Sequence, residues 1–74
     1  MEKKNYEAVI EAILFTMGES VELEKIAAAL ELPVEETKEL VEHLRSEYET
    51  SGHGMKIIEL DGAYQMCTKS EMYE

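Results

Sequence analysis

His43 and its neighbours come closest to a chemical site in this sequence. Glu39 and Glu47 lie four residues to either side of His43, so on a helix the three side chains would share one face. An imidazole beside carboxylates can hold zinc, but the same spacing describes a surface histidine paired with a carboxylate, which we favour. A solvent-facing side of the same helix accounts for the spacing of Glu35, Glu39 and Glu42. The sequence therefore predicts neither a metal site nor a catalytic acid–base pair.

The other reactive side chains have no partners at useful spacings. Cys67 is the only cysteine, and it has no Cys or His at the spacing of a metal ligand or an activated nucleophile. Gly52 and Gly54 precede a β-prone segment rather than a helix, which argues against a phosphate-binding loop, and His53 lies between them without an evident partner. We therefore expect a protein that is not an enzyme and that needs no cofactor.

The first element is a helix predicted over residues 5–17, ended by Gly18, which can adopt a left-handed conformation. Its apolar residues recur at i, i+3, i+4 and i+7, the signature of one buried face: Tyr6, Val9, Ile10, Ile13, Leu14 and Met17. Ala8, Ala12 and Phe15 lie off that face. A helix with two apolar faces usually has two surfaces to pack against.

Two more helices are predicted over residues 22–31 and 34–50, with Pro33 in the short turn between them. Residues 55–60 and 63–68 are β-prone and are joined by Asp-Gly, a strong signal for a two-residue type I′ hairpin. Three helices, a short turn before the third and a closing two-stranded hairpin predict a mainly α (α+β) winged helix-turn-helix.

Both faces of the predicted hairpin carry apolar residues. The two-residue turn places Ile57 and Tyr64 on one face, and Ile58 and Leu60 on the other. Only one face of a two-stranded wing can pack against the core. The candidate partner or homodimer interface therefore consists of the apolar residues left over on the first helix and the wing: Ala8, Ala12, Phe15, Ile58 and Leu60. The other interpretation is that these residues complete a small core.

Size and charge favour association with proteins. Residues 1–74 form one small domain, which buries only about 60% of its unfolded surface and is marginally stable alone. The chain has 17 acidic and 7 basic residues and a formal net charge of −10, which disfavours nucleic acids and anionic membranes. The third helix has six glutamates against Lys38 and Arg45, so it would repel DNA phosphates. With no signal peptide or spanning segment evident, we expect a cytoplasmic location.

Two segments of the chain resemble the segregation and condensation protein B family. The segment from Ile10 to Leu30 opens with IEAILFTMGE, and the segment from Leu44 to Met66 contains GMKIIELDGAYQM. The resemblance spans roughly residues 7 to 68. It differs from the family pattern at Ser20, where the family often has proline, and at Cys67.

The resemblance implies a scaffold subunit of the prokaryotic SMC–kleisin complex, which compacts and segregates chromosomes. Such proteins have two winged-helix domains, dimerise largely through the first and bind the kleisin, segregation and condensation protein A. This chain would be the first domain of a longer protein, without the kleisin-binding second domain, and associated with the nucleoid through the complex. We therefore predict a homodimerising, non-catalytic scaffold; the alternative is a DNA-binding transcription regulator with the same fold.

Overall fold

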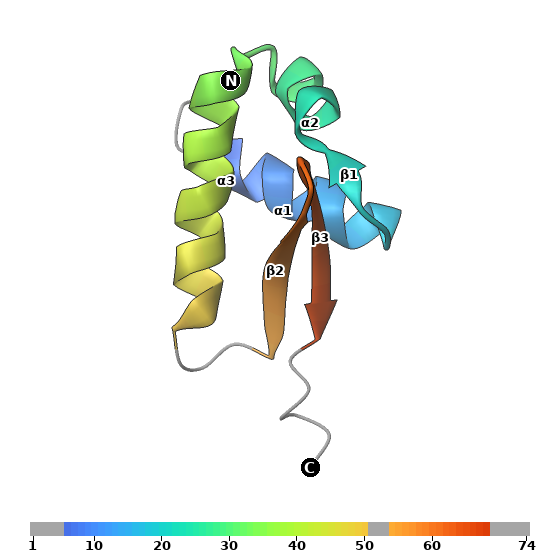
Figure 1. Ribbon diagram of the computed structural model, residues 1–74. Helices are drawn as coiled ribbons and strands as arrows, with labels where there is room; N and C mark the ends of the chain where they lie inside the picture. The colour runs from blue at the N-terminus through green and yellow to red at the C-terminus, as the bar shows by residue number, and fades with distance from the viewer. Residues whose placement is uncertain (1–5, 51–53, 69–74) are drawn as a thin grey trace.

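A computed structural model describes residues 6–50 and 54–68 of the chain, so the glycine break around His53 lies largely outside the described residues. The winged helix-turn-helix is confirmed, with the elements in the predicted order and one short strand in addition (Figure 1). The elements are α1 (Tyr6–Met17), β1 (Val21–Glu22), α2 (Leu23–Leu30), α3 (Val34–Glu49), β2 (Met55–Leu60) and β3 (Ala63–Thr68).

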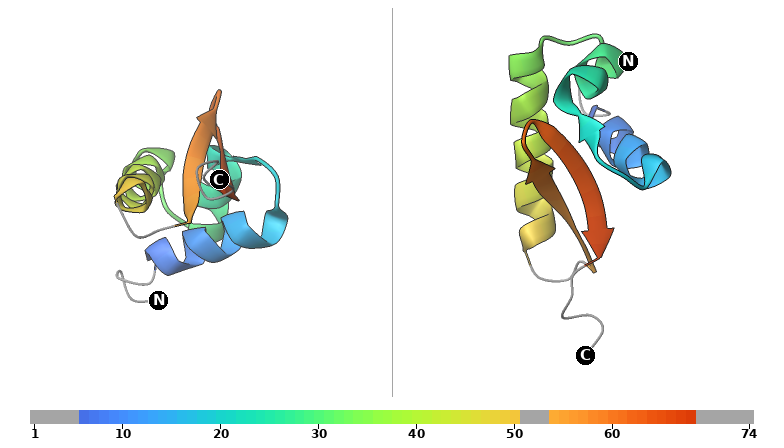
Figure 2. Two further views of the ribbon diagram at one scale, coloured as in Figure 1. Left: turned by 90° about the horizontal axis from the view of Figure 1, so that it is seen from below. Right: turned by 45° about the vertical axis from the view of Figure 1, so that its right-hand side comes forward.

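The three helices and the sheet enclose one small core. Helix α3 stands beside β2, and α1 crosses behind the sheet, as Figures 1 and 2 show. Ile10 and Leu14 of α1 are fully buried, which confirms the centre of the predicted apolar stripe. The buried cluster draws on every helix and strand: Ile10, Leu14, Val21, Ile26, Leu30, Val41, Leu44, Ile57, Tyr64 and Met66.

The hairpin has the predicted strands and turn. Asp61 and Gly62 have φ values of 53° and 88°, the positive values that a type I′ turn requires. Ile57 pairs with Met66 and Ile58 with Gln65, so the predicted division of the two faces is correct. Strand β1 was not predicted, because a two-residue strand is too short to show alternation. It pairs with β3, so the wing is a three-stranded sheet of order β1-β3-β2 rather than a two-stranded ribbon.

Backbone hydrogen bonds fix both ends of α2, and the one at its start ties it to the wing. Leu23 donates its backbone N–H to the carbonyl of Gly62 over 3.0 Å, which satisfies a donor at the start of α2 that no side chain caps. At the other end Glu31 has a φ of 58°, and the backbone N–H of Leu32 reaches the carbonyl of Ala27. This is a Schellman ending with glutamate in the position that glycine usually takes.

The buried stripe of α1 ends earlier than predicted. Met17 was expected on the buried face, but its side chain is 51% exposed. Gly18 follows it with a φ of 68° and turns the chain toward β1, so the last turn of α1 extends past the core. Among the described residues, no helix combines the length and the apolar character needed to cross a membrane.

Candidate interaction surfaces

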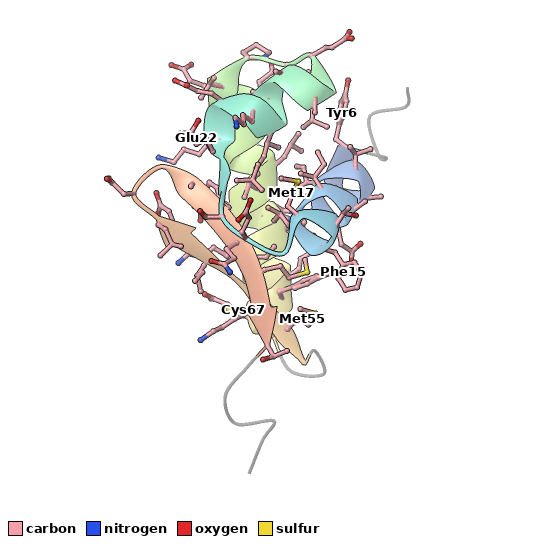
Figure 3. The ribbon with its side chains drawn as sticks, turned by 90° about the vertical axis from the view of Figure 1, so that its right-hand side faces the viewer. Tyr6, Phe15, Met17, Glu22, Met55 and Cys67 are labelled. Atoms are coloured by element: carbon pink, nitrogen blue, oxygen red, sulfur yellow. The ribbon has the colours of Figure 1, made fainter. Side chains whose placement is uncertain are left out.

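The outer face of α1, which we define as Ala8, Ala12 and Phe15, is exposed as predicted. With 3.6 residues per turn, these positions lie on the far side of the helix from buried Ile10 and Leu14. Phe15 is 69% exposed and projects away from the sheet in Figure 3. Because the core is already filled by the opposite side of the helix, these residues do not complete it. An exposed phenylalanine beside two small residues is a surface that another protein can cover.

The wing contributes a second and separate apolar surface. Leu60 is 46% exposed near the hairpin turn, whereas Ile58 is half-buried. Both lie on the sheet face opposite Ile57, which belongs to the core. The outer face of α1 also points away from the core. The five predicted interface residues therefore form two patches that face different directions, and one flat contact does not cover both.

Helix α3 uses part of its acidic side to hold the sheet. Glu42 was expected to be solvated, but it is half-buried and accepts a hydrogen bond of 2.8 Å from the hydroxyl of buried Tyr64. Arg45 donates to Glu42 over 3.3 Å and, through Nε, to the carbonyl of Ile57 over 3.1 Å. Burial and the Glu42 carboxylate both raise the pKa of Tyr64, so this phenol stays protonated and donating. Glu42 therefore has a structural role that its position on a polar stripe did not reveal.

Two exposed polar contacts join α1 to α3. His43 pairs through Nδ1 with Oε2 of Glu7 at 2.6 Å, rather than with Glu39 or Glu47, the two carboxylates that the sequence placed beside it. The hydrogen bond that His43 donates to Glu7 and the charges of Glu7 and Glu47 raise the pKa of His43. Similarly, the hydroxyl of Tyr48 donates to Glu11, and partial burial with this contact raises the pKa of Tyr48 to about 12.

The donor atoms of Glu7, His43 and Glu47 lie within 4.8 Å of one another. Three such atoms could coordinate one metal ion. However, the position of the two carboxylates beside His43 is equally well explained by their attraction to a protonated imidazole. Glu7 comes from another helix, so its place beside His43 could not be read from sequence spacing. The absence of a metal requirement stays a prediction.

An open groove lies between the start of α1 and the first half of α3. Its volume is about 530 Å³, and its walls combine apolar and acidic side chains. The residues that line it are Tyr6, Glu7, Leu32, Glu36, Glu39, Leu40 and His43. We call this feature the acidic groove. The sequence prediction missed it, because Leu32 lies in the inter-helix turn and Tyr6 was assigned to the core.

Together these surfaces define a winged-helix protein suited to protein contacts rather than to DNA phosphates. In a winged helix that reads DNA, α3 would face the phosphates, but here it carries six glutamates and two basic residues. A family model described as "Segregation and condensation complex subunit ScpB" matches residues 8–74. The chain belongs to this family.

Individual relatives agree with the family model. The chain is 66% identical over 71 residues to segregation and condensation protein B of Agathobacter rectalis, covering 95% of this chain and 38% of the relative. It is 54% identical over 74 residues to the same protein of Lachnoclostridium phytofermentans, covering 100% of this chain and 39% of the relative. The chain therefore spans well under half the length of these relatives.

A solved structure matches the fold. It is a crystal structure of the dimer of a ScpB N-terminal domain complexed with a ScpA peptide, with a TM-score of 0.90 and 34% identity, covering 95% of this chain and 88% of that one. The resemblance noted from the sequence assigned kleisin binding to the second domain. In this relative, a ScpA peptide is bound to a dimer of the first domain.

Proposed function

We propose that the chain is the N-terminal winged-helix domain of a longer, two-domain scaffold subunit of the SMC–kleisin complex, with no catalytic activity of its own. It forms a homodimer, and the dimer binds the kleisin, segregation and condensation protein A. In this role it acts in the cytoplasm at the nucleoid, through the complex, in chromosome condensation and segregation. The observation that carries the proposal is the 0.90 TM-score to a ScpB N-terminal domain seen as a dimer with a ScpA peptide.

The outer face of α1 is the homodimer contact in this proposal. If two α1 helices pack antiparallel about a centre between residues 11 and 12, Phe15 of one protomer lies opposite the partner's Ala8. A two-fold axis repeats that contact, so Ala8 of each protomer receives a phenylalanine. Burying one phenylalanine contributes about 1.5–3 kcal/mol. Because a domain this small is marginally stable, the paired helices also stabilise the fold.

Sedimentation velocity tests this contact directly. The 8.5 kDa chain should sediment as a dimer at micromolar concentration, and Phe15→Glu should make it a monomer that keeps its helical circular dichroism spectrum. Leu60→Glu places the same charge on an exposed apolar residue of the wing and should leave the dimer intact. A monomeric wild type would overturn the homodimer. Loss of the dimer in Leu60→Glu but not in Phe15→Glu would move the contact to the wing.

Kleisin binding has its own experiment. Peptides that tile segregation and condensation protein A of the same genome can be titrated into the chain by calorimetry. One contiguous region should bind with saturable heat, and a scrambled version of that region should not. If no peptide bound while the chain was dimeric, the kleisin part of the proposal would fail and the dimer would stand.

The alternative of a DNA-binding transcription regulator is not favoured. Glu59, Leu60 and Asp61 make the wing tip acidic and apolar, whereas wings that enter a DNA groove use Arg or Lys. An electrophoretic mobility assay at low salt should show no shift with the chain. Tight binding that weakens steeply as salt rises would reverse this conclusion.

A further inference from the structure

The acidic groove has an apolar floor and a charged rim. Tyr6, Leu32 and Leu40 are half-buried, so each keeps part of its apolar surface accessible from the groove. Glu36 and Glu39 are exposed at the edge on the α3 side. This division into an apolar centre and a polar rim is the usual anatomy of a protein–protein contact.

Carboxylates outnumber basic groups in the rim, where His43, paired with Glu7, is the one basic side chain among the residues that line the groove. Three glutamates line the groove, and among the described residues that line it there is no lysine or arginine. Glu36 and Glu39 lie one helical turn apart on α3, and Glu7 faces them from α1. A segment carrying lysine or arginine on both sides of an apolar side chain would complement this rim, while nucleic acid and acidic segments would be repelled.

The shape of the groove also favours a segment of a protein over a small molecule. Its volume of about 530 Å³ is large enough for a ligand, but the groove is open to solvent. Small molecules bind where most of their surface is enclosed. A peptide needs to bury only one face in the groove. The rest of its binding free energy comes from charges along its length.

Residues of both the floor and the rim are held in place by contacts within the chain. Leu32 is set by the left-handed conformation of Glu31 and by the backbone hydrogen bond to Ala27. Glu7 is oriented by its 2.6 Å contact with His43 across the two helices. A surface that is already ordered loses less conformational entropy when a partner binds.

We propose that the acidic groove is a docking site for a basic amphipathic segment of a partner protein. One apolar side chain of that segment packs on Tyr6, Leu32 and Leu40. Lysine or arginine residues on either side of it reach Glu36 and Glu39 on α3 and Glu7 on α1. The proposal does not rest on the homodimer, because none of the three residues of the outer face of α1 lines the groove.

The experiment uses the full chain and a fluorescent probe peptide in which a lysine pair flanks a single leucine on each side, with serine and glycine elsewhere. Anisotropy should show saturable binding at low ionic strength. Replacing the leucine of the probe by serine should weaken binding about tenfold, and replacing its lysines by glutamates should abolish it. A serine probe that binds as well as the leucine probe would show that the floor is not used, which would overturn the proposal.

Charge-reversal variants of the chain distinguish binding in the groove from attraction of the probe by the total charge. The double variant E36K/E39K removes the rim on α3 and should lose probe binding at least about tenfold. The double variant E35K/E49K is the matched control, because it makes the same charge change on exposed residues of the same helix outside the groove. Equal losses in the two variants would mean that the probe responds to total charge, and the groove would be rejected.

Two further measurements keep the result interpretable. Thermal unfolding of each double variant verifies that the chain is folded at the assay temperature. Phe15→Glu, made to break the homodimer, should keep the probe affinity of the wild type. A folded Phe15→Glu chain that no longer binds the probe would contradict the independence of the two surfaces, while its failure to dissociate would affect the proposed homodimer alone.

Discussion

The outer face of α1 and the outward side of α3 belong to helices that pack on the same core, yet their chemistry is opposite. On α1 the outward residues are Ala8, Ala12 and the 69% exposed Phe15. On α3 they are mostly glutamates, two of which edge the acidic groove. An apolar helix face gains free energy from any contact that removes it from water. An acidic face gains from a partner of opposite charge, so the two faces suit different partners.

This difference shows why the helix-turn-helix fold does not by itself imply DNA reading. The fold depends on the inward sides of the helices and on contacts such as that of Tyr64 with Glu42. The outward side of α3 is free to change its charge, because it contributes little to the core. A winged helix therefore specifies an arrangement of surfaces, and the residues on those surfaces decide what binds.

The largest effect should come from the inward side of α1. Leu14→Ala removes a fully buried side chain and should lower the free energy of unfolding by about 2–5 kcal/mol. Ile10→Val, a milder change in the same core, should cost about 0.5–1.5 kcal/mol. Thr16→Ala, at an exposed position, should stay within about 0.5 kcal/mol. Urea unfolding measures all three, and a harmless Leu14→Ala would contradict the division of α1 into two faces.

The next largest effect should come from the hydrogen bond that joins the sheet to Glu42 of α3. Tyr64→Phe deletes the hydroxyl that donates to Glu42 and should destabilise the domain by about 1–2 kcal/mol. Tyr48→Phe removes the more exposed contact with Glu11 and should cost less. Chemical unfolding gives both values. If the order were reversed, the α3–sheet contact would not be the stronger polar link.

A negative charge should stabilise α3 at its first turn and destabilise it at its last turn. Glu35 lies in the first turn, where the helix dipole favours negative charge, and the last turn has no basic residue. Glu49→Lys at the other end should therefore raise stability by about 0.3–1 kcal/mol, and Glu35→Lys should lower it by a similar amount. Both differences should shrink at high salt. Urea midpoints at low and high ionic strength provide the measurement.

The smallest effect is the pH dependence at the α1–α3 contact. Glu7 and Glu47 hold the pKa of His43 above 6.5 in the folded chain. A raised folded-state pKa means that the contribution is fully present below about pH 6.5 and is lost as the pH rises through the folded value. The difference in unfolding free energy between wild type and His43→Gln should follow this direction. An NMR titration of His43 with a midpoint below 6.5 would disprove the pairing.

Several features could be predicted because their signals are local. The Asp61-Gly62 turn, the period of Ile10 and Leu14, and Pro33 at the start of α3 each depend on a few neighbouring residues. The partner of His43 and the role of Glu42 could not be predicted, since Glu7 and Tyr64 lie 36 and 22 residues away in the chain. Strand β1 was missed because two residues are too short to show alternation and because its pairing with β3 exists only in the folded chain.

The sequence by itself determined the order of the three helices and the two hairpin strands, the two-faced character of α1, the acidity of α3 and the register of the hairpin. Periodicity and turn chemistry act over one or two turns of chain, so they can be read without the fold. Tertiary structure alone decided that the apolar residues of α1 and the wing form two patches, that Glu42 joins the sheet, and that Tyr6, Leu32 and Leu40 share one groove. Those outcomes depend on how helices cross, which no local pattern encodes.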